Sequence, residues 1–226
     1  GEDGLVKTQA TSVYSLAWNA NSSQIVYASG QYLIIQSLQA SIKALSWKAH
    51  EGVILKLDWN PINELILSGA EDGKYKIWDG FGRQLYSSSP CNFPITSVAW
   101  SPDGLLFAIG SYNMLRLCDQ QGWTYSIDRP SSGSILNLAW SCDGTQIVGA
   151  GAAGHVVLAQ VIDRCMEYDV FQVTLRDEHS LSVYNAQNGA IENLELRDRV
   201  IKISFCFDYL IVLTATQCHI YNTASP

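Results

Sequence analysis

The six residues Ile54-Leu-Lys-Leu-Asp-Trp59 belong to a motif that recurs along the chain at a nearly constant interval. Its counterparts are Val13-Tyr-Ser-Leu-Ala-Trp18, Ile95-Thr-Ser-Val-Ala-Trp100, Ile135-Leu-Asn-Leu-Ala-Trp140 and, with Phe in place of Trp, Val200-Ile-Lys-Ile-Ser-Phe205. The four tryptophans are 41, 41 and 40 residues apart. Large apolar residues mostly alternate with small or polar ones, and this period of two is that of a β-strand. The motif therefore predicts inner strands at 13–18, 54–59, 95–100, 135–140 and 200–205.

Turn residues and further apolar runs follow the inner strands. The turns include Asn60-Pro61, Ser101-Pro-Asp-Gly104 and Ser141-Cys-Asp-Gly144. Short strands separated by such turns, repeated about every 40 residues, are typical of four-stranded antiparallel units. One such sheet cannot bury both faces alone, and closing a stack of sheets into a ring protects the edges. We therefore expect an all-β fold, a β-propeller that occupies residues 1–226 as one domain.

The composition of the 226-residue chain excludes several classes of protein. Apolar residues make up 47% and charged residues 15%, which argues against a disordered chain. The net charge of −7 disfavours a nucleic-acid partner, since it would repel phosphates. No apolar run approaches the roughly 20 residues of a membrane helix, and the N-terminus shows no leader, so we expect neither membrane insertion nor a secretion signal. Six cysteines without regular spacing predict reduced, mostly buried thiols in a cytosolic protein.

The opening of the chain is irregular. Residues 1–7 match the segment Ala70 to Lys76 and predict a partial blade. However, Lys7 lies 11 residues before Trp18, whereas Lys76 lies 24 before Trp100, so 13 residues are missing at this junction. We expect either an unplaced loop and strand between about Lys7 and Thr11 or a deletion there. Because the chain opens in mid-blade, we also expect it to be an incomplete propeller or part of a longer chain.

A second irregularity is a surplus before the last repeat. Trp140 and Phe205 are 65 residues apart, about 25 more than the other steps. The surplus, an insertion at about 163–195, contains the strand-like runs Phe171–Leu175 and Leu181–Tyr184 and the turn signal Asn188-Gly189. It predicts a hairpin on the outer edge of one blade, which either packs on its own blade or docks a partner.

The repeat resembles the WD-repeat family over nearly the whole chain. The best unit runs from His50 to Asp79, with Ala49-His50 in place of the family's Gly-His and Trp78-Asp79 as the Trp-Asp pair. In that family a histidine, a serine, an aspartate and a tryptophan form a structural hydrogen-bonded tetrad, and the matching residues here are His50, Ser68, Asp72 and Trp78. The resemblance thus implies a WD40-type propeller in which the Ser, His and Asp hold a blade together rather than act as a nucleophile triad.

The other units have lost this network. Their aspartate position holds Asn113 or Ala153, and their tryptophan position holds Cys118, Ala159 or Tyr221. We expect these blades to be held by apolar packing, with Cys118 as a buried, unreactive thiol.

Neither a metal site nor a cofactor site is predicted. The four histidines, at 50, 155, 179 and 219, show no zinc-ligand spacing. The glycine-rich stretch Gly149 to Gly154 lies between two strands and opens no helix, so it does not predict a dinucleotide site. We therefore expect no catalytic residues, no small-molecule substrate and no enzymatic activity.

The chain also resembles one particular WD-repeat family, the subunit numbered eighty of the intraflagellar transport B complex. This finer resemblance rests on stretches of sequence that a generic blade does not require. They are Trp47 to Trp59, Leu115-Arg-Leu-Cys-Asp119 with Gly122-Trp123, Gly144-Thr-Gln-Ile147 with Gly154-His-Val-Val157, and Phe171-Gln-Val-Thr-Leu175. It implies two tandem propellers and a helical region in a non-enzymatic scaffold for cilium assembly and cargo transport, with this chain as most of the first propeller. The implied partners are other proteins of that complex. The implied location is the cytoplasm and the cilium or flagellum, with its basal body and axoneme.

Binding is expected on exposed loops, because loops carry function more often than strands do. The loops are His50 to Gly52, Asn92 to Pro94 and Ser131 to Gly133, together with Arg176 to Ser180 in the insertion. The candidate partner-binding residues are Glu51, Asn92, Phe93, Ser132, Arg176, Glu178 and His179. The alternative function is a WD-repeat scaffold of another assembly, a vesicle coat or a ubiquitin-ligase substrate receptor.

Overall fold

The computed structural model describes residues 8–39, 41–161 and 165–223, in which all regular structure is β-strand. The chain divides into two compact units, residues 1–160 and 161–226. Within the described residues there is no helix long and apolar enough to cross a membrane.

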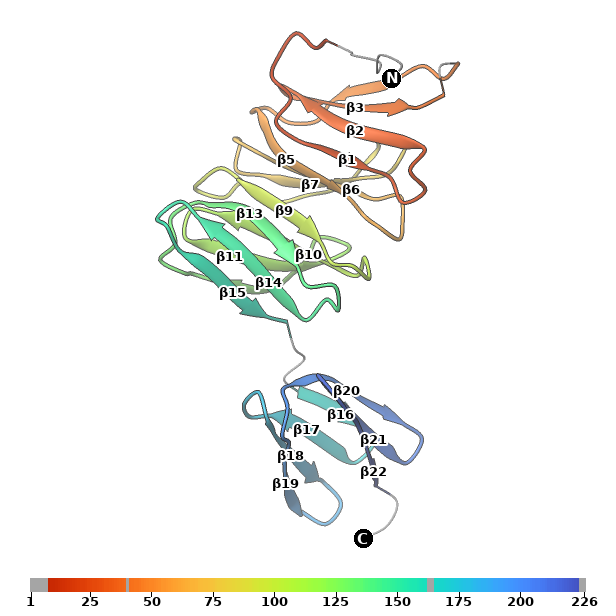
Figure 1. Cartoon of the computed structure of the whole chain (residues 1–226), viewed down its shortest axis with the longest axis vertical. Helices are drawn as coiled ribbons and strands as arrows, with labels where there is room; N and C mark the ends of the chain where they lie inside the picture. The colour runs from red at the N-terminus through yellow and green to blue at the C-terminus, as the bar shows by residue number, and fades with distance from the viewer. Residues whose placement is uncertain (1–7, 40, 162–164, 224–226) are drawn as a thin grey trace. The chain divides into compact units, whose positions relative to one another are not determined.

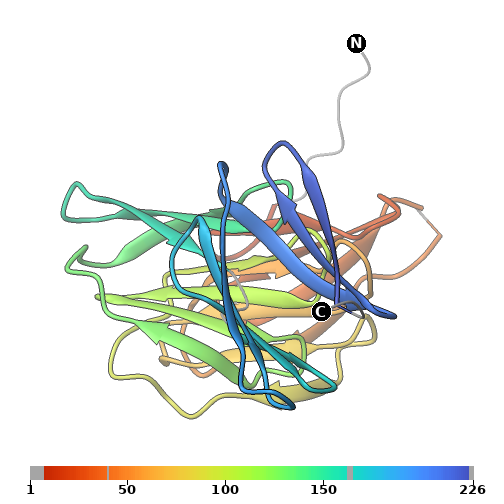
Figure 2. The same cartoon turned by 90° about the horizontal axis from the view of Figure 1, so that it is seen from below.

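The first unit is a succession of four antiparallel sheets in chain order, coloured from red to green in Figures 1 and 2. Three have four strands and the last has three. The strands are β1 (Leu16–Trp18), β2 (Gln24–Ser29), β3 (Tyr32–Ser37) and β4 (Leu45–Lys48); β5 (Ile54–Trp59), β6 (Ile66–Ala70), β7 (Tyr75–Trp78) and β8 (Gln84–Ser87); β9 (Ser97–Trp100), β10 (Leu106–Ser111), β11 (Met114–Asp119) and β12 (Thr124–Asp128); β13 (Ile135–Trp140), β14 (Gln146–Gly151) and β15 (Val156–Gln160). These sheets are propeller blades, and the ring that they begin is not closed.

The tryptophans of the motif occupy equivalent places in successive blades. Each is the last residue of an inner strand, and each pairs with a large apolar residue at the start of the next strand. The pairs are Trp18 with Ile25, Trp59 with Ile66, Trp100 with Phe107 and Trp140 with Ile147. The recurring sequence motif therefore marks one structural position, as a repeated blade requires.

The inner strands of neighbouring blades are linked by hydrogen bonds as well as by packing. The Trp100 backbone N–H donates to the Asp58 carboxylate across 2.8 Å. The Ser97 hydroxyl donates to the carbonyl oxygen of Ile135 across 2.7 Å. These contacts join β5 to β9 and β9 to β13, so the short polar side chains inside the motif fix one blade against the next.

Apolar side chains fill the space between blades. One cluster joins the first two blades and includes Val26, Leu33, Ile54, Trp59 and Trp78. The next joins the second and third blades and includes Leu67, Tyr75, Ile95, Trp100 and Phe107. At about 25 cal/mol per Å² of buried apolar surface, this packing is the main favourable contribution to the stability of the stack.

Two glycines allow adjacent blades to approach closely. An added Cβ on Gly69 would lie 2.4 Å from Ile95 Cγ2, and one on Gly110 would lie 2.9 Å from Ile135 Cβ. Ile95 and Ile135 both open a copy of the inner-strand motif. The glycine of one blade therefore receives the first isoleucine of the next.

The second unit consists of two antiparallel sheets joined by one core. The strands are β16 (Cys165–Tyr168), β17 (Phe171–Leu175), β18 (Ser180–Asn185) and β19 (Ile191–Glu195) in one sheet, and β20 (Val200–Cys206), β21 (Tyr209–Thr214) and β22 (Cys218–Asn222) in the other. The core contains Val173 and Leu181 from the first sheet and Val200, Ile203 and Val212 from the second.

This division corrects two expectations. The segment 163–195 is not a hairpin on the edge of a preceding blade, because its strands β16 to β19 pair with one another as a complete four-stranded sheet. The chain also forms two compact units rather than one domain, because this sheet buries its apolar face against β20 to β22. The predicted partial blade at 1–7 lies outside the described residues.

Other expectations differ in detail. The first and third inner strands are shorter than predicted, at Leu16–Trp18 and Ser97–Trp100, whereas those at 54–59 and 135–140 have the predicted bounds. The six cysteines, all among the described residues, are free thiols, but only Cys118 is buried and four are exposed. The expectation of mostly buried thiols is therefore wrong, because these cysteines lie on outward-facing strand and turn positions.

We predict that Gly110→Ala destabilises the chain by about 1–3 kcal/mol, because the new methyl group would lie 2.1 Å from Ser97 Oγ in the same blade and 2.9 Å from Ile135 Cβ in the next, and would overpack the contact between the two blades. Urea unfolding followed by tryptophan fluorescence measures the effect. Gly80→Ala is the matched control, since its nearest neighbour lies 3.5 Å from the added carbon, and it should change stability by less than about 0.5 kcal/mol. Equal losses in both variants would contradict the proposed close contact.

We predict a pH dependence of stability from Asp58. Burial between β5 and β9 raises the pKa of its carboxyl from 3.8 to about 6, although two backbone N–H groups partly oppose the shift. The folded state therefore binds a proton more readily than the unfolded state, and the stability contribution of Asp58 should rise as the pH falls from 7 to 4, by at most about 3 kcal/mol.

Asp58→Asn removes this titration. Its free energy of unfolding, measured against that of the unchanged chain from pH 7 to pH 4, isolates the contribution of this one carboxyl. A difference between the two proteins that stays constant over this range is incompatible with the raised pKa.

Candidate functional site

The four predicted tetrad residues meet in the second blade. His50 Nδ1 lies 3.0 Å from an Asp72 oxygen, and His50 Nε2 lies 2.8 Å from Ser68 Oγ. The Trp78 indole N–H donates to the same Ser68 oxygen across 2.9 Å. Asp72 also accepts the backbone N–H groups of Glu51 and Lys74. The network thus connects the loop before β5 with β6, β7 and the turn between them.

The hydrogen-bond partners assign the proton positions, because an ionised carboxylate can only accept and an indole N–H can only donate. Asp72 accepts from Nδ1–H, which leaves Nε2 of His50 to accept from the Ser68 hydroxyl, while that hydroxyl oxygen accepts from Trp78. Burial lowers the pKa of His50 and outweighs the neighbouring Asp72, which acts to raise it. The imidazole is therefore neutral at pH 7. The pKa of Asp72 is also lowered: burial raises it, but His50 and the backbone donors together outweigh that effect.

The Ser-His-Asp arrangement is not accessible to a substrate. His50 is 1% exposed and Ser68 is fully buried. A nucleophile must reach the reacting atom of a substrate. The hydroxyl oxygen of Ser68 is instead enclosed between strands and accepts the Trp78 N–H. The three residues therefore join the strands of the blade.

Cys118 occupies the tryptophan position of the third blade. It is fully buried, and its sulfur lies 3.5 Å from the Tyr75 hydroxyl oxygen. Burial raises the pKa of the Cys118 thiol to about 11, so the thiol stays protonated at neutral pH. A protonated, enclosed thiol is a poor nucleophile, consistent with a packing role.

The loops before the inner strands form a common surface with the turns that join the second and third strands of the blades. We call this surface the loop face; it comprises residues 30–31, 49–53, 71–74, 88–96, 112–113, 129–134 and 152–155. Backbone hydrogen bonds cross between neighbouring blades here. In each, a backbone N–H group donates to a carbonyl oxygen of the adjoining turn or loop, in the pairs Ile54 to Gly30, Cys91 to Gly73, Ile95 to Ala70 and Asn113 to Gly133. The loops are thus held in place by adjoining turns.

Three of the predicted partner-binding residues are exposed on the loop face. Glu51 forms an exposed ion pair with Lys48, 2.6 Å between nitrogen and oxygen. Asn92 is exposed, and Phe93 is 48% exposed. Phe93 packs against Tyr112, which is 47% exposed, with 4.8 Å between the ring centroids. Sequence reasoning missed Tyr112, although its place in a turn between two strands was a signal.

The prediction that Ser132 contacts a partner is wrong. It is 1% exposed, and its carbonyl oxygen accepts the Ala153 N–H under the turn between β14 and β15. An added Cβ on Gly151 would lie 2.5 Å from that oxygen, so the segment is tightly enclosed. The side chain of Ser132 therefore cannot contact a partner, and the neighbouring Ser131 is the exposed residue of this loop.

The remaining candidates, Arg176, Glu178 and His179, lie in the turn between β17 and β18 of the second unit. All three are exposed. The turn is ordered by a hydrogen bond from the His179 N–H to the Asp177 carboxylate and by the Val200 N–H, which donates to Glu178 O. They belong to the second unit, whereas the loop face belongs to the first.

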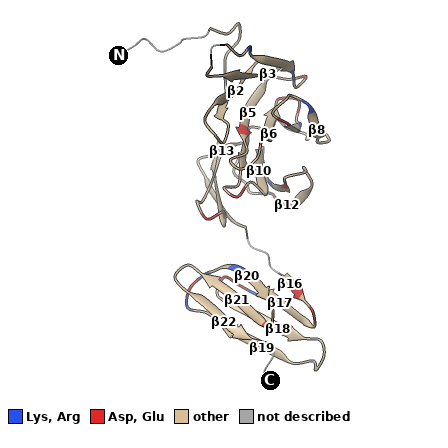
Figure 3. Ribbon diagram, turned by 90° about the vertical axis from the view of Figure 1, so that its right-hand side faces the viewer, with Lys and Arg blue, Asp and Glu red and all other residues tan. Residues whose placement is uncertain are grey.

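The described residues contain no cluster of three or more His, Cys, Asp or Glu side chains able to hold a metal ion. Figure 3 shows Lys and Arg as isolated spots along the ribbon rather than as a continuous stripe. The arrangement therefore offers exposed loops and aromatic rings as its binding features.

Sequence comparison matches residues 41–79 and 82–119 to the family described as WD domain, G-beta repeat. The chain belongs to the WD-repeat family. The first match contains the tetrad of the second blade, and the second covers β8 to β11. The resemblance inferred from the inner-strand motif is therefore confirmed.

Residues 163–225 match a second family, described as the IFT80 second β-propeller. Proteins of Mus musculus and Rattus norvegicus, each named intraflagellar transport protein 80 homolog, are 51% identical to this WD-repeat chain. The alignment is 236 residues long and covers 99% of this chain and 30% of each relative. The chain thus spans about three tenths of their length. The human F-box-like/WD repeat-containing protein TBL1Y is 30% identical over 48% of this chain and 24% of its own.

These matches confirm the finer resemblance but correct its placement. A chain lying entirely in the first propeller would not match a second-propeller family at 163–225, so that expectation is wrong for this segment. The match coincides with the second compact unit. The aligned length of 236 exceeds the 226 residues of this chain, so the relatives carry residues that it lacks. The gap expected between Lys7 and Thr11 stays a prediction.

We predict that Ser68→Ala lowers the free energy of unfolding by about 1–3 kcal/mol, because it leaves the buried Trp78 N–H and His50 Nε2 without a partner. Denaturant unfolding at pH 7 measures the loss. Ser126→Ala, on the exposed strand β12, is the control and should be nearly neutral. If both serine variants unfold at the same denaturant concentration, the network does not stabilise the blade.

Proposed function

We propose that this chain is part of a non-catalytic scaffold subunit of the intraflagellar transport B complex, which supports cilium assembly and ciliary cargo transport by binding other proteins. The observation that carries the proposal is the 51% identity, over 99% of the chain, to proteins named intraflagellar transport protein 80 homolog. Its partners would be other proteins of that complex. Its location would be the cytoplasm and the cilium or flagellum, with the basal body and axoneme.

The loop face supports a binding role. Its loops are tied to neighbouring blades by backbone hydrogen bonds, so little conformational freedom remains to be lost on association. Phe93 and Tyr112 together present a half-exposed aromatic surface at this end of the blades. Aromatic side chains are enriched among the residues that dominate protein interfaces. We propose Glu51, Asn92 and Phe93, with Tyr112 beside them, as contact residues.

The turn at Arg176, Glu178 and His179 is a second proposed contact. Its side chains are exposed and carry charge of both signs, while its backbone is fixed by hydrogen bonds. Such a turn can present side chains to a partner without prior ordering.

The chemistry of the described residues argues for binding without catalysis. The Ser68, His50 and Asp72 group is enclosed, and the Cys118 thiol is buried and protonated. The net charge of −7 and the scattered basic residues argue against nucleic acid. We therefore propose protein partners, with no nucleic acid, no direct membrane insertion, no cofactor and no small-molecule substrate.

A scaffold of another assembly is the alternative. The match to an F-box-like/WD repeat-containing protein favours it, but it reaches 30% identity over only 48% of this chain. The transport relatives match both compact units at higher identity. A vesicle-coat or ligase role therefore has weaker support.

We predict that Phe93→Asp in the full-length protein lowers recovery of complex B proteins about tenfold in co-purification from ciliated cells, because it puts a charge into an aromatic contact. Phe207→Asp is the control: Phe207 is 80% exposed in the second unit and lies outside both proposed contacts. Recovery unchanged for Phe93→Asp would remove the loop face from the function. Co-purification of a coat or ligase assembly with the unchanged protein would instead favour the alternative.

A further inference from the structure

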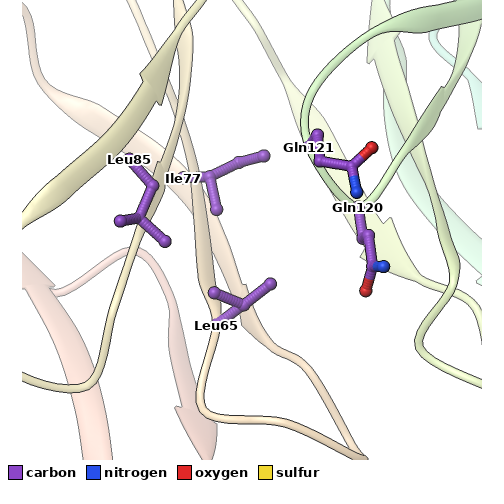
Figure 4. Close-up of a pocket in the computed structure, with 5 residues that line it drawn as sticks. All are labelled: Leu65, Ile77, Leu85, Gln120 and Gln121. Atoms are coloured by element: carbon purple, nitrogen blue, oxygen red, sulfur yellow. The ribbon is translucent and has the colours of Figure 1, made fainter.

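A cleft of about 300 Å³ lies between the second and third blades (Figure 4). Its lining residues Leu65, Leu85 and Gln120 lie at the starts of β6 and β8 and at the end of β11, which is the opposite end of the strands from the loop face. Leu65, Ile77 and Leu85 of the second blade line one wall, and Gln120 and Gln121 of the third blade line the other. This volume is at the lower end of the roughly 300–1,000 Å³ of small-molecule sites. It suits one anchoring side chain better than a large ligand.

The glutamine wall of the cleft is fixed before any partner arrives. Gly122 has a φ of +100° and lies so close to Tyr86 that an added Cβ would be 2.4 Å from its ring. The Tyr75 hydroxyl donates to the Gly122 carbonyl across 3.2 Å, and the Gln120 N–H donates to Leu105 O across 3.0 Å. The turn of the third blade is therefore docked on the second, which makes the cleft a preformed feature.

A β-bulge places an aliphatic side chain in the opening. In the pairing of β7 with β8, Ile77 faces Tyr86 and Trp78 faces Gln84, so Leu85 has no partner residue. A bulge of this kind redirects a side chain out of the regular pleat. Leu85 is 57% exposed, whereas Ile77 behind it is 1% exposed. The cleft thus has a buried apolar floor and an exposed apolar rim.

Two acidic residues adjoin lining residues of the cleft in the chain. Glu64 precedes Leu65, and Asp119 precedes Gln120. Neither forms an ion pair within the described part of the chain. Arg83, in the neighbouring turn, is already paired with Asp79 across 2.6 Å. One oxygen of the Asp119 carboxylate accepts the backbone N–H groups of Gln121 and Trp123, whereas Glu64 is exposed. A basic partner would therefore meet the exposed Glu64 carboxylate and the second oxygen of Asp119, while the glutamine amides can hydrogen-bond to its main chain.

We propose that this cleft binds a segment of a partner protein in which an aliphatic side chain lies next to Lys or Arg. The aliphatic side chain fills the space over Ile77 beside Leu85, and the basic residue lies against Glu64 and Asp119. This surface is distinct from the loop face, and the inference stands whether or not the loop face binds complex B proteins.

The test is selection of short peptides from a displayed library on the purified chain, after removal of peptides that also bind the Leu85→Asp variant. The retained peptides should carry an aliphatic residue beside Lys or Arg. Their affinity, measured by fluorescence anisotropy, should fall about tenfold with Leu85→Asp or Glu64→Lys and should weaken with added salt. Thermal melting by circular dichroism establishes that the variants remain folded.

Matched controls are Leu38→Asp, at a leucine that is 58% exposed in the first blade, and Glu192→Lys, on an exposed strand of the second unit. Both should leave peptide affinity unchanged. The inference is overturned if no peptide survives the removal step, if the survivors lack basic residues, or if the controls weaken binding as much as the cleft variants do.

Discussion

Every sheet of this protein must bury apolar side chains on its faces, and it can do so only against another sheet. The inner-strand motif meets this requirement in two places. Its first isoleucine enters the space left by a glycine of the preceding blade, as Ile95 does at Gly69 and Ile135 at Gly110. Its last residue, the tryptophan, closes the other end of the strand opposite an apolar partner. The contact between blades, rather than any single blade, is the unit of stability.

This dependence on packing explains why, among the described residues, a single blade carries the tetrad. In the second blade a buried imidazole and an indole N–H satisfy each other through Ser68 and Asp72. The third blade replaces the tryptophan with Cys118 and fills the same region with Tyr75 and Phe107. Apolar contact suffices there, and a buried polar network confers an advantage only when every member has a partner.

The same contacts place both proposed binding surfaces of the first unit at the ends of its strands. Hydrogen bonds between adjacent blades hold the loop face at one end, and Gly122 docks on Tyr86 to shape the cleft at the other. The stack thus displays two surfaces of different chemistry, one with half-exposed aromatic rings and one with a pocket lined by aliphatic and glutamine side chains. Surfaces of this kind suit the simultaneous binding of several proteins, which is the task of a scaffold.

The sequence by itself determined the features that depend on local period and residue type. The alternation of apolar residues set the inner strands. The resemblance to the WD-repeat family located the tetrad at His50, Ser68, Asp72 and Trp78, because a repeated blade keeps matching residues at matching places. Only the tertiary structure decided what depends on contacts between distant segments. The tertiary structure divides the chain after residue 160 and buries Ser132 under a neighbouring turn. It also packs Phe93 against Tyr112 and leaves Leu85 without a partner in the pairing of β7 with β8. Burial and packing between blades cannot be recognised from a sequence period, because they depend on which segments of the folded chain contact one another.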